Sequence, residues 1–402
     1  MTGRSKAALM AAFAVDNVGS GLFLPLAVFY AVRAVGLPVG VAGTVVGVAG
    51  LAGFAVPPLA GRLAHARGAK QVVVLAQLLQ GAGALLYLVA QGPVTVFAAA
   101  QLMSTGLQFF YCSLTLLIAD ATAAAAKERA FARVGQVRSL AFGLGNFAAA
   151  GAIALGGDRV LRWLVGLDGL TFLVSAVLLV VLVDATPADH GGAPATGVTT
   201  VLRDRRYVAM MTATFLLVLT TDTAPIGLPV YLTEVLHGPA WLAPTVLAIS
   251  VVLSSVLGVR VVDALRGRRR TRSMQAGGLV YLGWSLAAMA MLALPSSWVV
   301  PYGLLVLVLL VAGNKVVYPM SAALSDALAP RHARAGYLAT YQYAFTLAQS
   351  VGPLVVALFA LADWAPWGVL VGTNLAGVLV LGWIGTRLRD DVNRAQPELV
   401  SA

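Results

Sequence analysis

Long apolar runs separated by short polar loops dominate this chain. About twelve runs can be delimited, at residues 7–32, 37–63, 71–91, 93–119, 131–156, 161–184, 207–232, 240–263, 273–294, 298–325, 335–361 and 366–388. A bilayer-spanning helix needs about 20 apolar residues, and lipid leaves only helices and closed barrels as spanning structures. The runs lack the alternation of barrel strands. The pattern therefore predicts an all-α integral membrane protein with twelve transmembrane helices.

The charges indicate how these helices are oriented. Only 11% of residues are charged and 59% are hydrophobic, whereas soluble domains are about a quarter charged. The net charge of +11 comes from basic residues in short loops, mostly on one side of the predicted bundle. Such an excess marks the cytoplasmic face, so it predicts a cell-membrane protein with both termini cytoplasmic and no nucleic-acid partner. The first run lacks a small-residue cleavage site and is expected to remain as a helix.

Metal, nucleotide and catalytic motifs are missing from the sequence. There is one cysteine, Cys112, and the four histidines show no ligand spacing. No Gly-Lys-Ser/Thr phosphate loop occurs, and no nucleophile stands at a recognisable spacing from a base. We therefore expect no cofactor, no metal and no enzymatic activity.

The chain reads as two similar halves. A polar stretch after the sixth run predicts a division into a six-helix bundle at 1–184, a cytoplasmic linker at 185–206, a second six-helix bundle at 207–390 and a tail at 391–402. Asp120 precedes a basic loop after the fourth run, as Asp326 does after the tenth. Val165-Gly166-Leu167-Asp168 opens the sixth run much as Val371-Gly372-Thr373-Asn374 opens the twelfth. Six plus six helices in the same orientation indicate a parallel duplication.

This organisation resembles the major facilitator superfamily over essentially the whole chain. Gly61-Arg62-Leu63-Ala64-His65-Ala66-Arg67-Gly68-Ala69-Lys70 is similar to the family signature after the second helix, with His65 in place of its acid and Ala66 in place of its arginine. The resemblance implies pseudo-twofold symmetry and a cytoplasmic latch between the halves. Its expected residues are Gly61, His65, Gly68, Lys70, Asp120, Asp263 and Asp326.

The first helix adds a likeness to one branch of the family. Asp16-Asn17-Val18-Gly19-Ser20-Gly21-Leu22-Phe23-Leu24-Pro25 resembles the opening helix of bacterial drug:proton antiporters. This sequence departs from two signatures of that branch. Leu102 stands where the fourth helix has an arginine, and Gly352-Pro353 occurs in the eleventh helix, not the fifth. The resemblance implies a secondary transporter, with export favoured.

Four charged residues inside the predicted spans are the candidate mechanistic groups: Asp16, Arg138, Asp222 and Lys315. A charge at bilayer depth costs several kcal/mol unless it faces water or a partner. By family analogy all four belong to helices that line or flank the central cavity, and none to the peripheral third, sixth, ninth or twelfth. The acids could load and release protons or bind a cationic group, and the bases could attract an anion. The alternative is static ion pairs between them.

Polar side chains at helical spacing predict the walls of a cavity. The candidates are Asn17, Ser20, Gln101, Ser104, Gln108, Asn146, Asn314, Tyr318, Tyr341, Gln342 and Gln349. Such stripes turn away from lipid. The alternative is that they hydrogen-bond between helices of a closed bundle.

Three functions remain open from the sequence. The first is proton-coupled efflux of a small, amphipathic or drug-like molecule by alternating access. The second is proton-coupled uptake of an organic anion or zwitterion through Lys315 and Arg138. The third, from another class, is a non-transporting membrane scaffold or receptor. The expected partners are protons, a small molecule and membrane lipid, and the expected state is a monomer.

Overall fold

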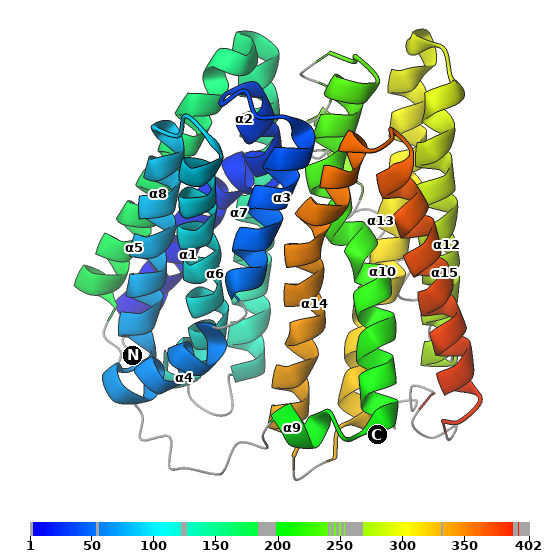
Figure 1. The fold of residues 1–402 in the computed structure, drawn as a ribbon. Helices are drawn as coiled ribbons and strands as arrows, with labels where there is room; N and C mark the ends of the chain where they lie inside the picture. The colour runs from blue at the N-terminus through cyan, green and yellow to red at the C-terminus, as the bar shows by residue number, and fades with distance from the viewer. Residues whose placement is uncertain are drawn as a thin grey trace. The chain divides into compact units, whose positions relative to one another are not determined.

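In a computed structural model the regular elements of the described residues are helices (Figure 1). The described residues are 3–53, 56–121, 127–183, 198–239, 242, 245–246, 249–250, 253, 268–330, 333–388 and 393. Within these ranges, nine helices are long and apolar enough to cross a membrane. The protein is thus an all-α, multi-pass integral membrane protein, consistent with the predicted twelve helices.

The chain divides into two compact units. Unit 1 comprises Met1–Gly191, Leu228–Thr233 and Pro239–Ala248, and unit 2 comprises Gly192–Gly227, Glu234–Gly238 and Ile249–Ala402. The helices up to residue 182 are α1 (Gly3–Phe23), η1 (Leu24–Leu26), α2 (Ala27–Arg33), α3 (Val39–Ala52), α4 (Val56–Arg67), α5 (Ala69–Leu88), α6 (Pro93–Ala121), α7 (Lys127–Gly156), η4 (Gly157–Val160) and α8 (Leu161–Leu182).

The remaining helices follow after residue 182. They are α9 (Val198–Val201), α10 (Arg205–Val230), η5 (Tyr231–Val235), α12 (Arg270–Ala290), η6 (Met291–Ala293), α13 (Ser296–Leu328), α14 (Arg334–Ala357), η7 (Leu358–Ala360) and α15 (Ala365–Gly385). In unit 1, α5 packs against both α6 and α8. In unit 2, α12 packs in the same way against both α13 and α15. The two units therefore repeat one packing pattern, as expected of a duplication.

The predicted spans coincide with these helices, with three differences of detail. The first span is interrupted by the 3₁₀ turn Leu24–Leu26, where Pro25 lacks the N–H that an α-helix needs. The second span corresponds to two helices, α3 and α4. The seventh ends in the π-helical turn Tyr231–Val235. Most of the eighth predicted span, 240–263, lies outside the described residues.

Helix α8 shows how these helices are built for lipid. Apart from Arg162 near its start, its exposed side chains are apolar, among them Leu167, Leu170, Val174, Val177 and Val181. Its buried face carries Asp168 and Ser175 together with apolar side chains. Lipid does not penalise exposed apolar atoms, so the polar side chains are turned towards neighbouring helices. This distribution is the reverse of that of a surface helix in water.

Two local features define helix ends. Asp204 caps α10, because its Oδ1 accepts hydrogen bonds from the backbone N–H groups of Arg206 (3.0 Å) and Tyr207 (3.1 Å). Gly68 joins α4 to α5 with φ of +86°, a left-handed conformation that favours glycine. The glycine of the signature segment is therefore needed for the turn itself.

Candidate functional site

Asp16 lies in α1, where that helix packs against both α7 and α8. Its side chain is buried, with 4% of its surface exposed. Asn17 Nδ2 donates to Asp16 Oδ2 at 3.3 Å and to the carbonyl oxygen of Phe13 at 2.9 Å. Gln77 of α5 lies within reach of Asp16, yet both atoms of its buried amide lack a hydrogen-bond partner in this structure. Asp16 is thus a buried carboxyl group with polar neighbours that can rearrange around it.

The positive charge of Arg138, in α7, interacts electrostatically with the carboxylate of Asp16. Among the described side chains, however, Arg138 makes no ion pair with Asp16. Its guanidinium donates to Tyr111 Oη at 3.2 Å and lies over the rings of Phe110 (5.0 Å) and Tyr111 (5.2 Å). Its Nε is buried without a partner. Arg138 is therefore held by aromatic rings of α6, and its charge is not neutralised by direct contact with Asp16.

The expectation of four charges inside the spans is wrong, because a fifth is present. Asp168 of α8 is fully buried, with 0% of its surface exposed, and neither carboxyl oxygen has a hydrogen-bond partner. It also lies in the sixth span, which was expected to carry no such charge. From the sequence it served only as a marker of the repeat. The recurrence of Asp168, Thr171 and Ser175 at three- and four-residue spacing is the signal that could have identified it.

Asp222 of α10 is the unit 2 counterpart of Asp16. Its Oδ2 is buried with no hydrogen-bond partner. Gly352 of α14 approaches the backbone of Asp222 so closely that a Cβ there would lie 3.3 Å from the carbonyl oxygen. Asp222 follows Asp16 by the same number of residues as Asn374 follows Asp168. The two acids therefore occupy equivalent positions in the repeat.

Lys315 of α13 is half-buried and makes no ion pair with Asp222 among the described side chains. Its neighbours in the predicted stripe bond to other helices of unit 2. Asn314 Oδ1 accepts from Tyr281 Oη of α12 at 2.7 Å, and the hydroxyls of Tyr318 and Thr221 of α10 are 3.1 Å apart. These contacts favour interhelical hydrogen bonding for this part of the stripe.

The other predicted wall residues divide by exposure. Tyr341 is buried and donates to Ser321 Oγ at 2.7 Å, whereas Gln342 and Gln349 of the same helix, α14, are exposed in the chain. In α6, Gln101 donates to Thr105 Oγ1 at 3.1 Å.

The remaining wall residues lie at helix contacts within unit 1. A Cβ at Gly53, at the end of α3, would meet Ser104 Oγ at 2.7 Å and Gln108 Cγ at 3.3 Å, so these α6 side chains face α3. Asn146 of α7 is buried and donates to the carbonyl oxygen of Phe142 at 3.1 Å, and Ser20 of α1 is partly buried.

The predicted latch is described only in part. Lys70 Nζ donates to the carbonyl oxygen of Val180 at 3.1 Å and so holds the end of α8 within unit 1. Asp326 lies near enough to Arg270 for their charges to interact within unit 2. Asp263 lies outside the described residues. The structure describes only the backbone of Gly61, His65 and Asp120. The latch as a device between the halves stays a prediction.

A polar junction in unit 2 escaped the sequence reasoning. Asn374 of α15 is fully buried and donates to Thr220 Oγ1 of α10 at 2.9 Å and to Ser285 Oγ of α12 at 3.3 Å. The Thr220 hydroxyl in turn lies 3.1 Å from Asn374 Oδ1. Asn374 stands at the repeat position of Asp168, so the two units place an amide and an acid at equivalent sites.

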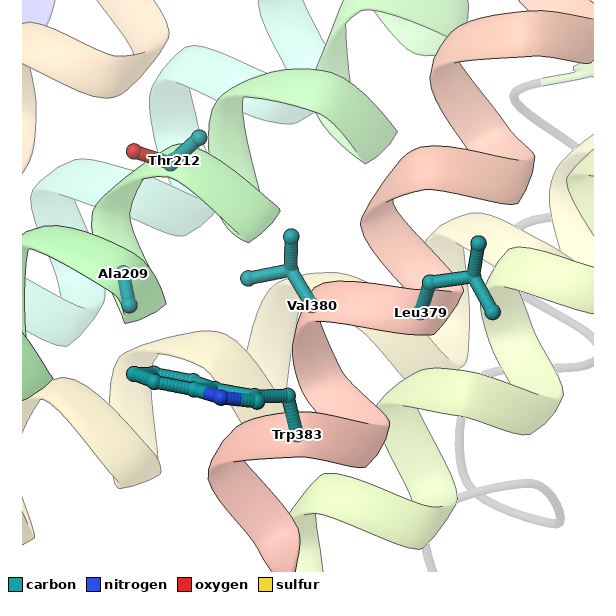
Figure 2. Close-up of a pocket in the computed structure, with 5 residues that line it drawn as sticks. All are labelled: Ala209, Thr212, Leu379, Val380 and Trp383. Atoms are coloured by element: carbon teal, nitrogen blue, oxygen red, sulfur yellow. The ribbon is translucent and has the colours of Figure 1, made fainter.

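An open pocket of about 450 Å³ lies between α10 and α15, lined by Ala209, Thr212, Leu379, Val380 and Trp383 (Figure 2). Figure 2 shows the Trp383 ring lying across one end of this pocket. The guanidinium carbon of Arg387 is 4.0 Å from the centroid of that ring. None of the predicted charges lines the pocket, and the only described lining side chains with a polar atom are Thr212 and Trp383. We therefore do not assign the substrate site to it.

The comparisons with known proteins agree with this architecture. Residues 9–353 match the Major Facilitator Superfamily. No curated protein sequence matches the chain. The fold is similar to that of the nucleoside transporter NupG, with a TM-score of 0.75 and 12% identity over 95% of this chain and 98% of that one.

Two further solved structures are similar. A POT family transporter in complex with 5-aminolevulinic acid gives a TM-score of 0.76 at 11% identity, over 95% of this chain and 96% of that one. The human organic anion transporter MFSD10 gives a TM-score of 0.63 at 16% identity, over 95% of this chain and 100% of that one. At these identities the likeness is one of fold alone.

Proposed function

The chain belongs to the major facilitator superfamily, and on that basis we propose that it is a proton-coupled exporter of a small, amphipathic molecule. Family and structural neighbours indicate a transporter and not an enzyme. Alternating access would move the substrate while the buried carboxyl groups exchange protons. The cell membrane, with both termini cytoplasmic, is the proposed location, and a monomer is the proposed state.

The observation that carries this proposal is a pair of acids at equivalent repeat positions, the buried Asp16 and the partly buried Asp222, whose Oδ2 is buried. A membrane protein retains such costly groups where they serve ion or proton movement. Neither acid is in an ion pair within its own unit among the described side chains, which disfavours a purely static role. A carboxyl group that is buried in one state and wetted in another can bind a proton in the first and release it in the second.

A second candidate function, uptake of an organic anion or zwitterion, is supported by Arg138. Its guanidinium contacts Tyr111 and Phe110 and makes no direct ion pair with an acid of unit 1 in the described residues. A cation held in this way can receive a carboxylate from a substrate. Two transporters of similar fold support this candidate: the POT family transporter in complex with 5-aminolevulinic acid and the organic anion transporter MFSD10. Their sequences are too different from this one to add further support.

Thermal unfolding of the purified protein, measured against a panel of compounds, tests the substrate class. The panel contains a nucleoside, a dipeptide, an organic anion, 5-aminolevulinic acid and the lipophilic cation ethidium. A ligand present at about 100 times its Kd stabilises the protein by roughly 2.7 kcal/mol, so a true substrate raises the Tm measurably.

Transport of the stabilising compound is then measured in proteoliposomes with an imposed pH gradient. The proposal expects the compound to move against the direction of proton flow. Movement with the protons would favour the uptake candidate. Binding without any transport in either direction would contradict both and favour the receptor interpretation.

A further inference from the structure

We propose that Asp168 is a second proton-binding site of unit 1, which holds a proton in this structure and exchanges it with Asp16 across the contact between α1 and α8. The part played by Asp16 rests on the proposed function. The site itself rests on the surroundings of Asp168, which differ from those of its counterpart in unit 2.

The surroundings of Asp168 leave a negative charge without compensation. The side chain is 0% exposed, and both carboxyl oxygens lack a hydrogen-bond partner. It lies about 10 Å from the start of α8, at ~1.5 Å per residue, and therefore well inside the span. An isolated buried carboxylate is so unfavourable that such groups neutralise by taking up a proton. An unpartnered buried polar group in a native protein also calls for a specific explanation.

No described cation is placed to neutralise Asp168. The helices packed against α8 are α1 and α5, together with the short turn η4. Helix α1 contains the acid Asp16, and η4 contains the basic residue Arg159, which is exposed. In α5 the titratable groups are at its two ends, where Lys70 binds the carbonyl of Val180 and Tyr87 is buried. The group that acts electrostatically on Asp168 is therefore another carboxyl, Asp16.

The contact between α1 and α8 brings the two carboxyl groups together. A Cβ at Gly19 would lie 2.9 Å from Asp168 Oδ1, so the carboxyl packs directly on α1 at this glycine. Asp16 precedes Gly19 by one helical turn, about 5 Å along α1. Like charges this close oppose simultaneous ionisation, and paired carboxyl groups therefore tend to share a proton. Asp16 keeps 4% of its surface exposed, so it is the member of the pair nearer to water.

Comparison with the other repeat argues against a purely structural role. At the equivalent position, Asn374 cannot titrate, and it is satisfied by Thr220 and Ser285. Asp168 can titrate, and it has no such partners. If the position served only to join helices in both units, the acid would be expected to have partners like those of the amide. The difference points to a proton as the ligand of Asp168.

Infrared spectroscopy of purified protein with ¹³C-labelled aspartate tests the proton directly and needs no substrate. A protonated carboxyl group has a carbonyl band that a carboxylate lacks. We expect a band from a buried protonated aspartate at neutral pH that is lost in Asp168→Asn and retained in the control Asp363→Asn, which changes an exposed aspartate in a turn. Asparagine has nearly the same size and shape as aspartic acid, so this substitution removes the titratable group without adding bulk. An unchanged band in Asp168→Asn would overturn the proposal.

Hydrogen–deuterium exchange of the same band tests the connection to Asp16. The deuterium shift of the Asp168 band should be slower in Asp16→Asn than in the wild type, and unchanged in the control Asp363→Asn. Equal exchange rates in all three proteins would overturn the exchange step. If Asp168→Asn misfolds, Asp168→Glu made with ¹³C-labelled glutamate provides the second variant, in which a band from a buried protonated glutamate should appear; its absence there would count against the site.

A sodium ion is the alternative occupant of an acid in such a place. Stabilisation of the wild type by sodium chloride but not by choline chloride, lost in Asp168→Asn, would overturn the proton assignment. These readouts are independent of transport. A negative infrared result would therefore leave the proposed function standing, and a failure of proton-coupled transport would leave the Asp168 band unaffected.

Discussion

The close contact between α5 and α6 allows a stability prediction that can be worked from the structure. At Gly106 of α6, an added Cβ would lie 2.7 Å from the carbonyl oxygen of Ala76 and 2.7 Å from Gln80 Cγ, both in α5. Ordinary contacts of a Cβ begin near 3.4 Å. Because the carbonyl belongs to the helix backbone, α5 and α6 would have to separate by roughly 0.7 Å in Gly106→Ala.

The cost of that separation can be estimated against a matched control. Overpacking of this kind typically costs about 1–3 kcal/mol, and a gap of 0.5–1 Å already removes roughly a quarter to a half of a dispersion contact. Gly151 of α7 is the control, because a Cβ there would meet nothing within 4 Å. Both substitutions bring the same gain in helix propensity, so this gain cancels in the comparison. We expect Gly106→Ala to be less stable than Gly151→Ala by about 1–3 kcal/mol.

Reversible unfolding in mixed micelles, followed by circular dichroism, measures this difference. The wild type should lie between the two variants or near Gly151→Ala. Surface substitutions without a specific effect fall within about 0.5 kcal/mol of the parent. If Gly106→Ala and Gly151→Ala agree to within that margin, α5 and α6 do not approach each other as the structure has them.

Three further predictions concern polar contacts. A double-mutant cycle with Thr220→Val and Asn374→Leu should give a coupling free energy of unfolding of about 0.6–1.7 kcal/mol, and none would mean that the junction does not form. Tyr207→Phe removes a hydroxyl that lies 2.7 Å from Ser325 Oγ and donates to a backbone carbonyl at 2.8 Å; it should lower the free energy of unfolding by about 1–3 kcal/mol, and no loss would contradict this. Arg138→Lys should weaken binding of an anionic compound in the thermal-shift assay more than Tyr111→Phe, which keeps the ring; equal effects would argue against an anion at this guanidinium.

The arrangement of helices could be predicted from the sequence because lipid allows so few solutions. Runs of about 20 apolar residues specify spanning helices directly. The buried position of Asp16 follows from the same argument, since an acid in such a run must turn away from lipid. Breaks within the helices were harder to predict from the sequence. The 3₁₀ turn at Pro25 was not anticipated, because prolines are tolerated in membrane helices and the run continues through it.

The partners of the polar side chains could not be predicted, because they depend on which helices meet. Asn314 and Tyr318 lie on the predicted stripe of α13, yet their hydrogen bonds join it to α12 and α10. Spacing along one helix indicates a polar face, but not whether that face meets water or another helix. Asp168 was overlooked because the sequence placed it near the start of a span, whereas its burial depends on the approach of α1 at Gly19.

The central claim is that Asp16 couples protons to transport, and one pair of assays on Asp16→Asn tests it most directly. Proteoliposomes containing a pH-sensitive dye report substrate-driven proton movement, and counterflow of labelled substrate at equal pH reports alternating access alone. We predict that Asp16→Asn retains counterflow and loses substrate-driven proton movement. Proton movement equal to that of the wild type in Asp16→Asn would contradict the account.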